Sequence, residues 1–242
     1  MVPYRDQPLQ TPDSIRVLLL HPGASDADIE VSLMTIQLSA KPNFIALSYT
    51  WGNPVGEQNP SYREYDVFKL YISCAGEHIA VYENLYEALW RLREMQEYSP
   101  LWIDAICINQ KDDEERNHQL SLMSRIYCDA SWVIIWLGKD DVTVREAVQC
   151  LDGFRHEGDL VIQSMMSCQA ATQFLNSIPV RKKRALLDLF RRRWFERVWT
   201  LQEVLLPQRT RCLSGPPRTR HRSRHCIRGS LPEIRFERTR DF

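Results

Sequence analysis

The run Phe44-Ile-Ala-Leu-Ser-Tyr49 is almost entirely apolar and has the length of one strand. Two further runs share these properties, Leu101-Trp-Ile-Asp-Ala-Ile-Cys-Ile108 and Trp132-Val-Ile-Ile-Trp-Leu137. Strands that are covered on both faces read as continuous apolar runs, a pattern typical of parallel sheets. The three runs therefore predict strands of a buried, mostly parallel sheet, with the tryptophans of the second and third runs in its core.

Helical patterns separate these strands. Asn84 with Glu87 has the spacing of a helix N-cap, and Asp112 with Glu115 repeats it. The apolar residues that follow recur at helical spacing and predict two inward faces: Leu85, Ala88, Leu89 and Leu92, then Leu120, Met123, Tyr127 and Ala130. Shorter strands are predicted at Ile15 to Leu20 and Phe68 to Ser73, and last helices at about 182–192 and 195–206. The alternation predicts an α/β fold, a mostly parallel sheet flanked by helices.

Composition divides the chain into two parts. The 242 residues carry 31 Lys and Arg against 31 Asp and Glu, with 44% hydrophobic residues, enough for one sizeable core. Residues 216–242 hold eight Arg, no Lys and three acidic residues, without helical or strand periodicity. We therefore expect one domain over residues 1–215 and an Arg-rich, disordered tail over 216–242. An altered reading frame or a missed exon would produce such a tail as well.

Composition also excludes several classes of protein. The longest apolar run, Trp132 to Leu137, is far shorter than the roughly 20 residues of a membrane-spanning helix, and the N-terminus lacks a secretory signal. The seven cysteines include no C-x-x-C pair, so we expect reduced thiols. Cys212, His221, His225 and Cys226 lack the spacing of a zinc finger. These features predict a cytoplasmic protein with no membrane partner, no metal site and no nucleic-acid partner.

The sequence contains no standard enzyme signature: it has no G-x-G-x-x-G, P-loop, H-E-x-x-H or G-x-S-x-G. The candidate site residues are therefore polar and aromatic residues at the ends of the predicted strands. Ser48, Tyr49 and Trp51 lie where the first strand ends, at the edge where open α/β sheets bind ligands. The alternative is a simple turn made by Gly52-Asn-Pro54, with the aromatic residues packed inside. The sequence leaves both interpretations open.

Two carboxylates lie in apolar surroundings. Asp104 interrupts the second apolar run and needs partners if it is buried, so it is either a hydrogen-bond hub or, with Asn109 in the following loop, part of a site. On a helix, Glu203 shares a face with Trp199 and Leu206, which draws its carboxylate away from water. Burial raises the pKa of a carboxyl group and suits it to acid–base or cation-stabilising chemistry. The alternative for Glu203 is an internal salt bridge to a nearby arginine.

These residues fall within segments that resemble the heterokaryon incompatibility (HET) domain of filamentous fungi. The resemblance is carried by Ala46-Leu-Ser-Tyr-Thr-Trp-Gly52, by Leu101-Trp-Ile-Asp-Ala-Ile-Cys-Ile-Asn-Gln110 and by Arg193-Trp through Trp199 to Gln202-Glu203. The core motifs lie within 44–206, in family order. Phe44 stands where the family commonly has Tyr, and nothing after Gly215 resembles the family.

The resemblance implies a role in fungal non-self recognition, in which fusion of incompatible hyphae triggers cell death. HET domains are also distantly similar to Toll/interleukin-1 receptor (TIR) domains, which implies a flavodoxin-like, three-layer sandwich. In TIR proteins that cleave NAD, a glutamate on a later helix is catalytic, and its counterpart here is Glu203. The resemblance makes NAD a candidate substrate, with these residues as candidates for binding it: Ser48, Tyr49, Trp51, Asp104, Asn109 and Trp199.

Two functions remain open at this point. One is an NAD glycohydrolase, in which Glu203 stabilises the oxocarbenium-like ribose as nicotinamide leaves. The other is a non-enzymatic signalling module, which acts by self-association or by binding other incompatibility or receptor proteins.

Overall fold

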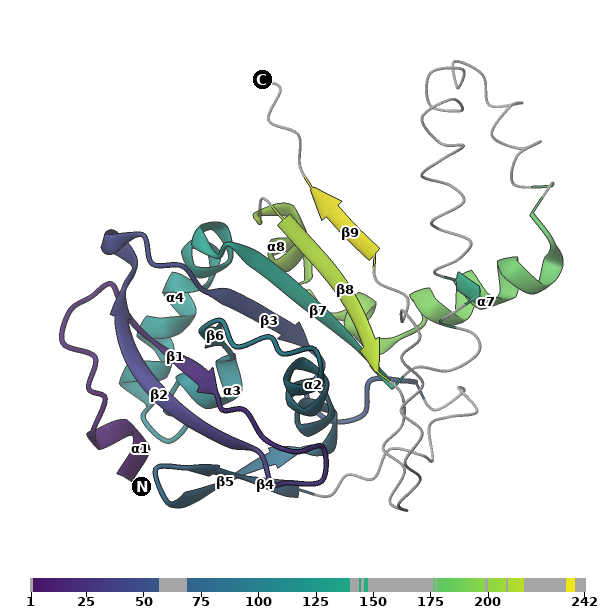
Figure 1. Ribbon diagram of the computed structural model, residues 1–242. Coiled ribbons are helices and arrows are strands. Elements are labelled where there is room, and N and C mark those ends of the chain that lie inside the picture. Colours follow the sequence, from purple (N-terminus) through teal and green to yellow (C-terminus); the bar gives the residue numbers. More distant parts are fainter. Residues whose placement is uncertain are drawn as a thin grey trace.

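The structure is a computed structural model (Figure 1) that describes residues 2–56, 69–139, 144, 146–147, 176, 178–198, 200–207, 209–215 and 234–237. In these residues one sheet has the strand order β5-β4-β2-β1-β6-β3-β7-β8-β9. The strands are β1 (Ser14–Leu20), β2 (Glu30–Gln37), β3 (Ile45–Tyr49), β4 (Lys69–Cys74), β5 (Glu77–Tyr82), β6 (Leu101–Trp102), β7 (Trp132–Lys139), β8 (Arg209–Gly215) and β9 (Ile234–Glu237). The helices are α1 (Val2–Arg5), η1 (Leu38–Ala40), α2 (Glu83–Glu94), α3 (Asp104–Cys107), α4 (Asp113–Asp129), α7 (Val180–Phe190), η3 (Arg193–Glu196) and α8 (Thr200–Leu205).

The centre of the sheet is parallel and its flanks are largely antiparallel. β3 pairs in parallel with β6 and β7, and β7 pairs in parallel with β8. β1 pairs antiparallel with β2 and β6, β4 with β5, and β8 with β9. The chain reverses tightly at the flanks: Ala75 and Gly76 both have positive φ, 51° and 79°, as a two-residue hairpin between β4 and β5 requires. The prediction of a mostly parallel sheet is therefore correct for the centre and wrong for the flanks, so the sheet is mixed.

Helices pack against both faces of the parallel centre. On one face, the Trp136 indole N–H of β7 donates to Asn84 Oδ1 of α2 at 2.8 Å. On the other face, the rings of Trp102 and Tyr127, a residue of α4, meet edge to face with centroids 5.6 Å apart. Ala46 lies beside Trp102 and Tyr49 beside Trp136, and because side chains alternate along β3 the two tryptophans face opposite sides. Trp102 and Trp136 are core residues, as predicted.

The second apolar run is not one strand, contrary to the prediction. β6 ends at Trp102, and Asp104–Cys107 forms the short helix α3. Asp104 Oδ1 accepts the N–H of Ala105 at 2.7 Å, so the helical turn provides a backbone donor for a carboxylate that would lie unsatisfied in a buried strand. The rest of the run is apolar because it is buried, and burial alone does not distinguish strand from helix.

The two predicted helix caps differ in outcome. Asp112 is the N-cap of α4 and accepts the N–H of Glu115 at 3.0 Å, as predicted. Asn84 is not a cap, because α2 begins one residue earlier, at Glu83. The Asn84 amide instead donates to Thr50 O at 2.7 Å and thereby joins α2 to the end of β3.

Other differences concern the inner face of α4 and the last part of the domain. Leu120 is 42% exposed, and the fully buried Gln119 takes the inward position, where its amide donates to Ser14 O. The helix predicted at 195–206 is divided into η3 and α8. Strands β2, β5 and β8 were not predicted, and β9 lies within the predicted tail, whose other residues lie outside the described ones. No described helix is long and apolar enough to cross a lipid bilayer.

Substitution of Trp136 by alanine tests the arrangement of the sheet core. Trp136 is 2% exposed and donates to Asn84, so Trp136→Ala leaves both a cavity and an unsatisfied amide oxygen. We expect a loss of about 3 to 5 kcal/mol in the free energy of unfolding, measured by urea denaturation. Tyr98→Ala is the matched control, because Tyr98 is 40% exposed; it should change the value by at most about 0.5 kcal/mol. An unchanged unfolding midpoint for Trp136→Ala would contradict the position of β7.

Candidate functional site

The neighbouring strands β3 and β6 send the chain to opposite faces of the sheet. After β3 the chain passes through β4 and β5 to α2 on one face, and after β6 it passes through α3 to α4 on the other. From β3 the chain proceeds to β6 on one side of β3 and then returns past β3 to β7 on its other side, so the strand order reverses at β3. The carboxyl end of β3 is therefore a topological switch point, the position where open α/β sheets bind ligands. The two segments that meet there, residues 50–56 and 103–112, are called the switch point below.

Trp51 and Asp104 join the two sides of the switch point. The indole N–H of Trp51, from the segment after β3, lies 3.0 Å from Asp104 Oδ2 and 3.2 Å from Asp104 Oδ1. Gly52 has a φ of 77°, which allows the chain to turn directly after Trp51. Trp51 is 45% exposed, so it presents a large aromatic surface to solvent beside a carboxylate.

Asp104 has a shifted protonation equilibrium. Desolvation by burial is the largest cause and raises the pKa of Asp104 from its ordinary 3.8 to about 6, and the negative charge of Glu203 acts in the same direction. The Ala105 N–H, the positive charge of Arg197 and the Trp51 indole oppose this shift and lower the pKa. Asp104 is therefore a carboxyl group that titrates close to neutral pH, a property that favours proton transfer.

Glu203 of α8 is a second carboxylate behind the switch point, and its side chain is 1% exposed. Ser48 Oγ of β3 donates to Glu203 Oε2 in a short hydrogen bond. Tyr127 OH lies 3.5 Å from Glu203 Oε1, and Arg197 Nη2 lies 3.4 Å from the same oxygen. The Trp194 indole N–H donates to Ser48 Oγ at 2.6 Å and so holds the hydroxyl toward Glu203. The internal ion pair expected as an alternative for Glu203 is thus present, with Arg197.

Arg197 connects the buried carboxylate to the switch point. Its Nη1 donates to Tyr49 O, at the end of β3, at 2.6 Å, while its Nη2 faces Glu203. Burial raises the pKa of the Tyr49 and Tyr127 phenols well above their usual value, so both stay protonated and Tyr127 can donate to Glu203 at neutral pH. The side chain of Arg197 is 23% exposed, against 1% for Glu203, so it is the partner that solvent reaches.

The structure brings together five of the seven predicted site residues. Ser48, Tyr49, Trp51, Asp104 and Glu203 lie at or behind the carboxyl ends of β3 and β6, linked by the contacts above. Asn109 does not join them, and Trp199 lies outside the described residues.

Three residues of this cluster were missed by the sequence analysis. Tyr127 was predicted only to lie on the inner face of a helix. The position of its hydroxyl near Glu203 was not predicted. Trp194 and Arg197 lie in the Arg193-Trp segment but had no assigned partner. Their partner strand is about 150 residues earlier in the chain, so local spacing carried no signal for these contacts.

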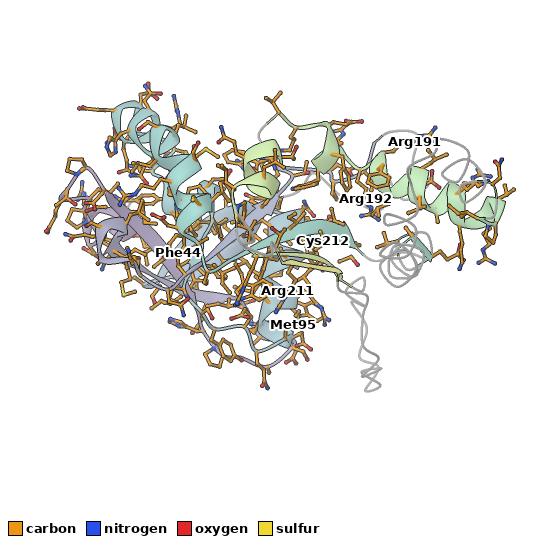
Figure 2. All side chains as sticks on the ribbon, turned by 90° about the horizontal axis from the view of Figure 1, so that it is seen from above. Phe44, Met95, Arg191, Arg192, Arg211 and Cys212 are labelled. Atoms are coloured by element: carbon orange, nitrogen blue, oxygen red, sulfur yellow. The ribbon has the colours of Figure 1, made fainter. Side chains whose placement is uncertain are left out.

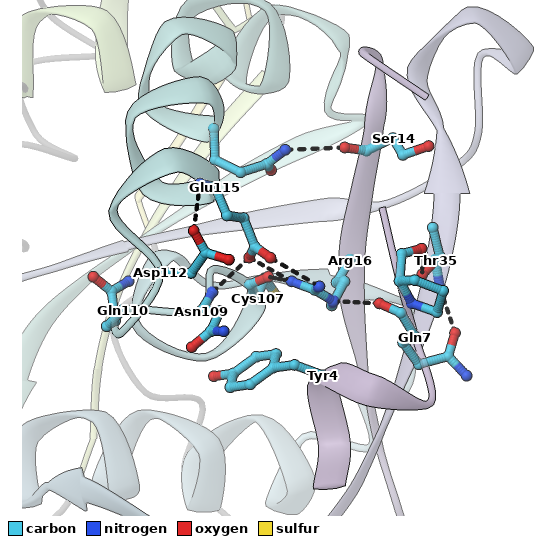
Figure 3. A network of polar contacts seen from close by, with 12 residues as sticks. Tyr4, Gln7, Ser14, Arg16, Thr35, Cys107, Asn109, Gln110, Asp112 and Glu115 are labelled. Carbon is cyan, nitrogen blue, oxygen red and sulfur yellow. Dashed lines mark hydrogen bonds and ion pairs between the residues drawn. The ribbon is translucent and has the colours of Figure 1, made fainter. Parts of the chain in front are cut away.

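Asn109 belongs to a polar network on the other side of the loop after β6 (Figure 3). Arg16 of β1 is 2% exposed and binds both carboxylate oxygens of Glu115, at 2.6 and 3.0 Å. Glu115 Oε1 also accepts the N–H of Asn109 at 2.7 Å, and Arg16 donates to Cys107 O at 3.2 Å. The ion pair therefore holds the end of α3 and the residues after it, through Cys107 O and the N–H of Asn109.

The N-terminal segment completes this network. Arg16 Nε donates to Gln7 O at 2.6 Å, and the Tyr4 ring lies 5.0 Å from the Arg16 guanidinium carbon. Asn109 lines a cavity of about 770 Å³ together with Tyr4, Arg16 and Glu115, away from Trp51 and Asp104. In the described part of the chain, no group of three or more His, Cys, Asp or Glu side chains could hold a metal ion.

These contacts define the class of the protein. It is an α/β domain that has one carboxylate at its switch point and a second, buried carboxylate bonded to the adjoining strand. The family model of the heterokaryon incompatibility protein (HET) matches residues 44–203, the segment that contains both carboxylates, and the chain belongs to this family. The resemblance found in the sequence is thereby confirmed.

A curated relative supports the same assignment. Heterokaryon incompatibility protein 6, OR allele, of Neurospora crassa is 30% identical over an alignment of 223 residues, and the match covers 79% of this chain and 32% of the relative. The chain thus spans about a third of the length of that relative. No solved structure matches the chain.

Removal of Glu115 tests the energetic weight of the buried ion pair. Glu115→Ala leaves Arg16, 2% exposed, without its carboxylate partner. Because a buried charge is then uncompensated, we expect a loss of about 3 to 5 kcal/mol in the free energy of unfolding. Asp113→Ala is the control: its pair with Arg116 has side chains 81% and 38% exposed, and its loss should stay below about 1 kcal/mol. Equal losses in the two variants would contradict the account.

The raised pKa of Asp104 predicts a pH dependence of stability. The folded state holds a proton on Asp104 up to about pH 6, whereas the unfolded chain loses it near 3.8. Ionised Asp104 therefore destabilises the fold above pH 6, and this cost disappears as the pH falls below about 4. Asp104→Asn never ionises, so its stability relative to the wild type should rise by about 2 kcal/mol from pH 4 to pH 7. A difference that is constant with pH would contradict the shift.

Proposed function

We propose that this chain is the death-signalling module of a fungal incompatibility reaction, which responds to the fusion of unlike hyphae. Membership of the HET family supports the proposal, because the matched segment contains the whole cluster around Glu203 and Asp104. The name of the Neurospora crassa relative, an incompatibility protein, supports it further. The chain covers only a third of that relative, so the proposal concerns the HET domain and not the remainder of such proteins.

We further propose that this domain has a TIR-like, flavodoxin-like layering and that its chemistry is hydrolysis of NAD. The parallel centre β6-β3-β7-β8 with helices on both faces supports the layering. The observation that carries the chemistry is the position of the two carboxylates. Asp104 lies beside the exposed Trp51 ring, and Glu203 lies behind it, paired with Arg197, which also binds the Tyr49 carbonyl at the end of β3.

In this proposal, each group has a defined role. The Trp51 ring stacks against the planar nicotinamide or adenine, and Asp104 accepts hydrogen bonds from ribose hydroxyls. The bond between ribose C1′ and the nicotinamide nitrogen breaks, and nicotinamide leaves with the bonding electron pair. Glu203 stabilises the positive charge that develops on the ribose. Water then forms the new bond to C1′ and gives its proton to solvent.

Access to Glu203 requires a rearrangement, because its side chain is 1% exposed. Among its partners, Ser48 and Tyr127 are buried core residues, whereas Arg197 reaches the surface. Entry of the ribose between Arg197 and Glu203 breaks one ion pair of 3.4 Å and leaves the core contacts intact. The phosphates of NAD would then offer Arg197 a new partner.

Nicotinamide release by the purified protein, at high protein concentration, tests this chemistry. Glu203→Gln keeps the shape of the side chain and removes its charge, so release should fall by about 100-fold or more. Glu196→Gln is the control, because Glu196 is exposed on η3, and it should retain full activity. Circular dichroism and melting curves show whether each variant is folded. No release by folded wild-type protein, or equal release by Glu203→Gln, would exclude the hydrolase.

A non-enzymatic signalling module is the second candidate, and the burial of Glu203 favours it. With Ser48, Tyr127 and Arg197 as partners, this carboxylate is fully satisfied as a structural hub. Such a module would pass on the death signal by self-association or by contact with other incompatibility or receptor proteins in the cytoplasm. Cell death in a fungal strain with no fall in cellular NAD would favour the module, whereas NAD loss that precedes death would favour the enzyme.

A further inference from the structure

Helix α7 extends from one end of the domain, with Arg191 and Arg192 where it meets the body (Figures 1 and 2). Its inner face is apolar as expected: Ala185 and Leu189 are each 2% exposed. An outer face of a helix at the surface is ordinarily polar. The outer face of α7 departs from this rule in two respects.

The first departure is a set of exposed apolar side chains. Val180 is 81% exposed, Leu187 57% and Phe190 52%. Val180 and Leu187 are seven residues apart and Phe190 follows three residues later, so the three lie along one stripe of the helix. Phe190 is held by the Phe195 ring, with centroids 5.1 Å apart, and still keeps half of its surface in solvent.

The second departure is a concentration of positive charge around this stripe. The helical neighbours of Leu187 at four and three residues before it and four after it are Lys183, Arg184 and Arg191. With Arg181 and Lys182, the first turns of α7 carry four consecutive cations and no acidic residue. Arg181 pairs with Glu146, and Arg191 pairs with Asp188. Lys182, Lys183 and Arg184 lie near the positive end of the helix dipole, where cations are unfavourable, so the dipole does not explain their presence.

We propose that the outer face of α7 binds the surface of a membrane that contains anionic lipids. Leu187, Phe190 and Val180 enter the boundary between headgroups and acyl chains, while the surrounding cations contact lipid phosphates and carboxylates. Apolar and cationic residues on one face fit such a surface better than a nucleic acid, whose backbone binds the cations but offers nothing to Leu187 and Phe190. The proposal is independent of NAD hydrolysis.

This proposal revises the expectation that the protein has no membrane partner. That expectation rested on the absence of a long apolar run, which detects only helices that span the bilayer. A helix that lies on the surface has apolar residues at helical spacing among charges, and α7 has this pattern. A headgroup-bound α7 would hold the domain at a membrane during the proposed death reaction.

Vesicle sedimentation with the full chain tests the proposal. The protein should bind vesicles of phosphatidylcholine with phosphatidylserine and should not bind vesicles of phosphatidylcholine alone. Binding should weaken as salt is added, because surface charges are screened. Lys183→Gln with Arg184→Gln should weaken binding about tenfold or more, since each cation near an anionic surface contributes to affinity.

Substitutions of the apolar stripe separate lipid binding from simple charge attraction. Leu187→Ser keeps every charge and the contact of Phe190 with Phe195, and it should weaken binding severalfold. Leu205→Ser on α8, also 57% exposed, and Arg125→Gln on α4, 45% exposed, are matched controls that should bind as the wild type does. Melting curves equal to that of the wild type establish that the variants are folded.

Three results would overturn the proposal. The first is that the folded wild-type protein does not bind vesicles with phosphatidylserine. The second is that Leu187→Ser binds as tightly as the wild type, because the attraction would then be one of charge alone. The third is that a single-stranded RNA, and not the vesicles, is bound and is lost on Lys183→Gln with Arg184→Gln.

Discussion

The burial of the Glu203 carboxylate is the constraint on which the arrangement of the domain depends. A charge without partners in a protein interior is very costly, so the elements around Glu203 must each present a donor to it. Ser48 is the donor from β3, Tyr127 is the donor from α4, and Arg197 is the donor from the segment between η3 and α8. Trp194 fixes the Ser48 hydroxyl from a fourth direction. Glu203 therefore joins α8 to β3, to α4 and to the segment between η3 and α8.

The same constraint links the fold to the switch point. Arg197 pairs with Glu203 and also binds the carbonyl of Tyr49, so the buried charge is one side chain away from the end of β3. Asp104 is influenced by both charges, Arg197 lowering its pKa and Glu203 raising it. The charge of Glu203 therefore acts on Asp104, which is half-buried beside Trp51, whereas Glu203 lies in the core. Such a pair, in different environments, is what acid–base or cation-stabilising chemistry requires.

The parts of the structure that the sequence predicted are those that depend on local pattern. β3 and β7 were predicted because both of their faces are buried, and the burial of Glu203 was predicted from helical spacing. The partners of Ser48 could not be predicted, because Trp194 and Glu203 are 146 and 155 residues away in sequence. The helix α3 was missed because a short apolar run is compatible with either a buried strand or a buried helix. Only the contacts of Asp104 distinguish the two structures. Asn109 was grouped with Asp104 because both lie near the end of the same apolar run, whereas in the structure its N–H binds Glu115, which pairs with Arg16.

The proposed ligand site of this domain is the switch point, where the segment after β3 meets the segment after β6. The indole N–H resonances of the tryptophans test it most directly, recorded by nuclear magnetic resonance while NAD is added to the protein. Trp51 donates to Asp104 at the switch point, whereas Trp90, on α2, donates to Ser25 O, outside the two switch-point segments. The account predicts that the Trp51 signal shifts with NAD and that the Trp90 signal does not. No shift at Trp51 with saturating NAD, or a shift confined to Trp90, would contradict it.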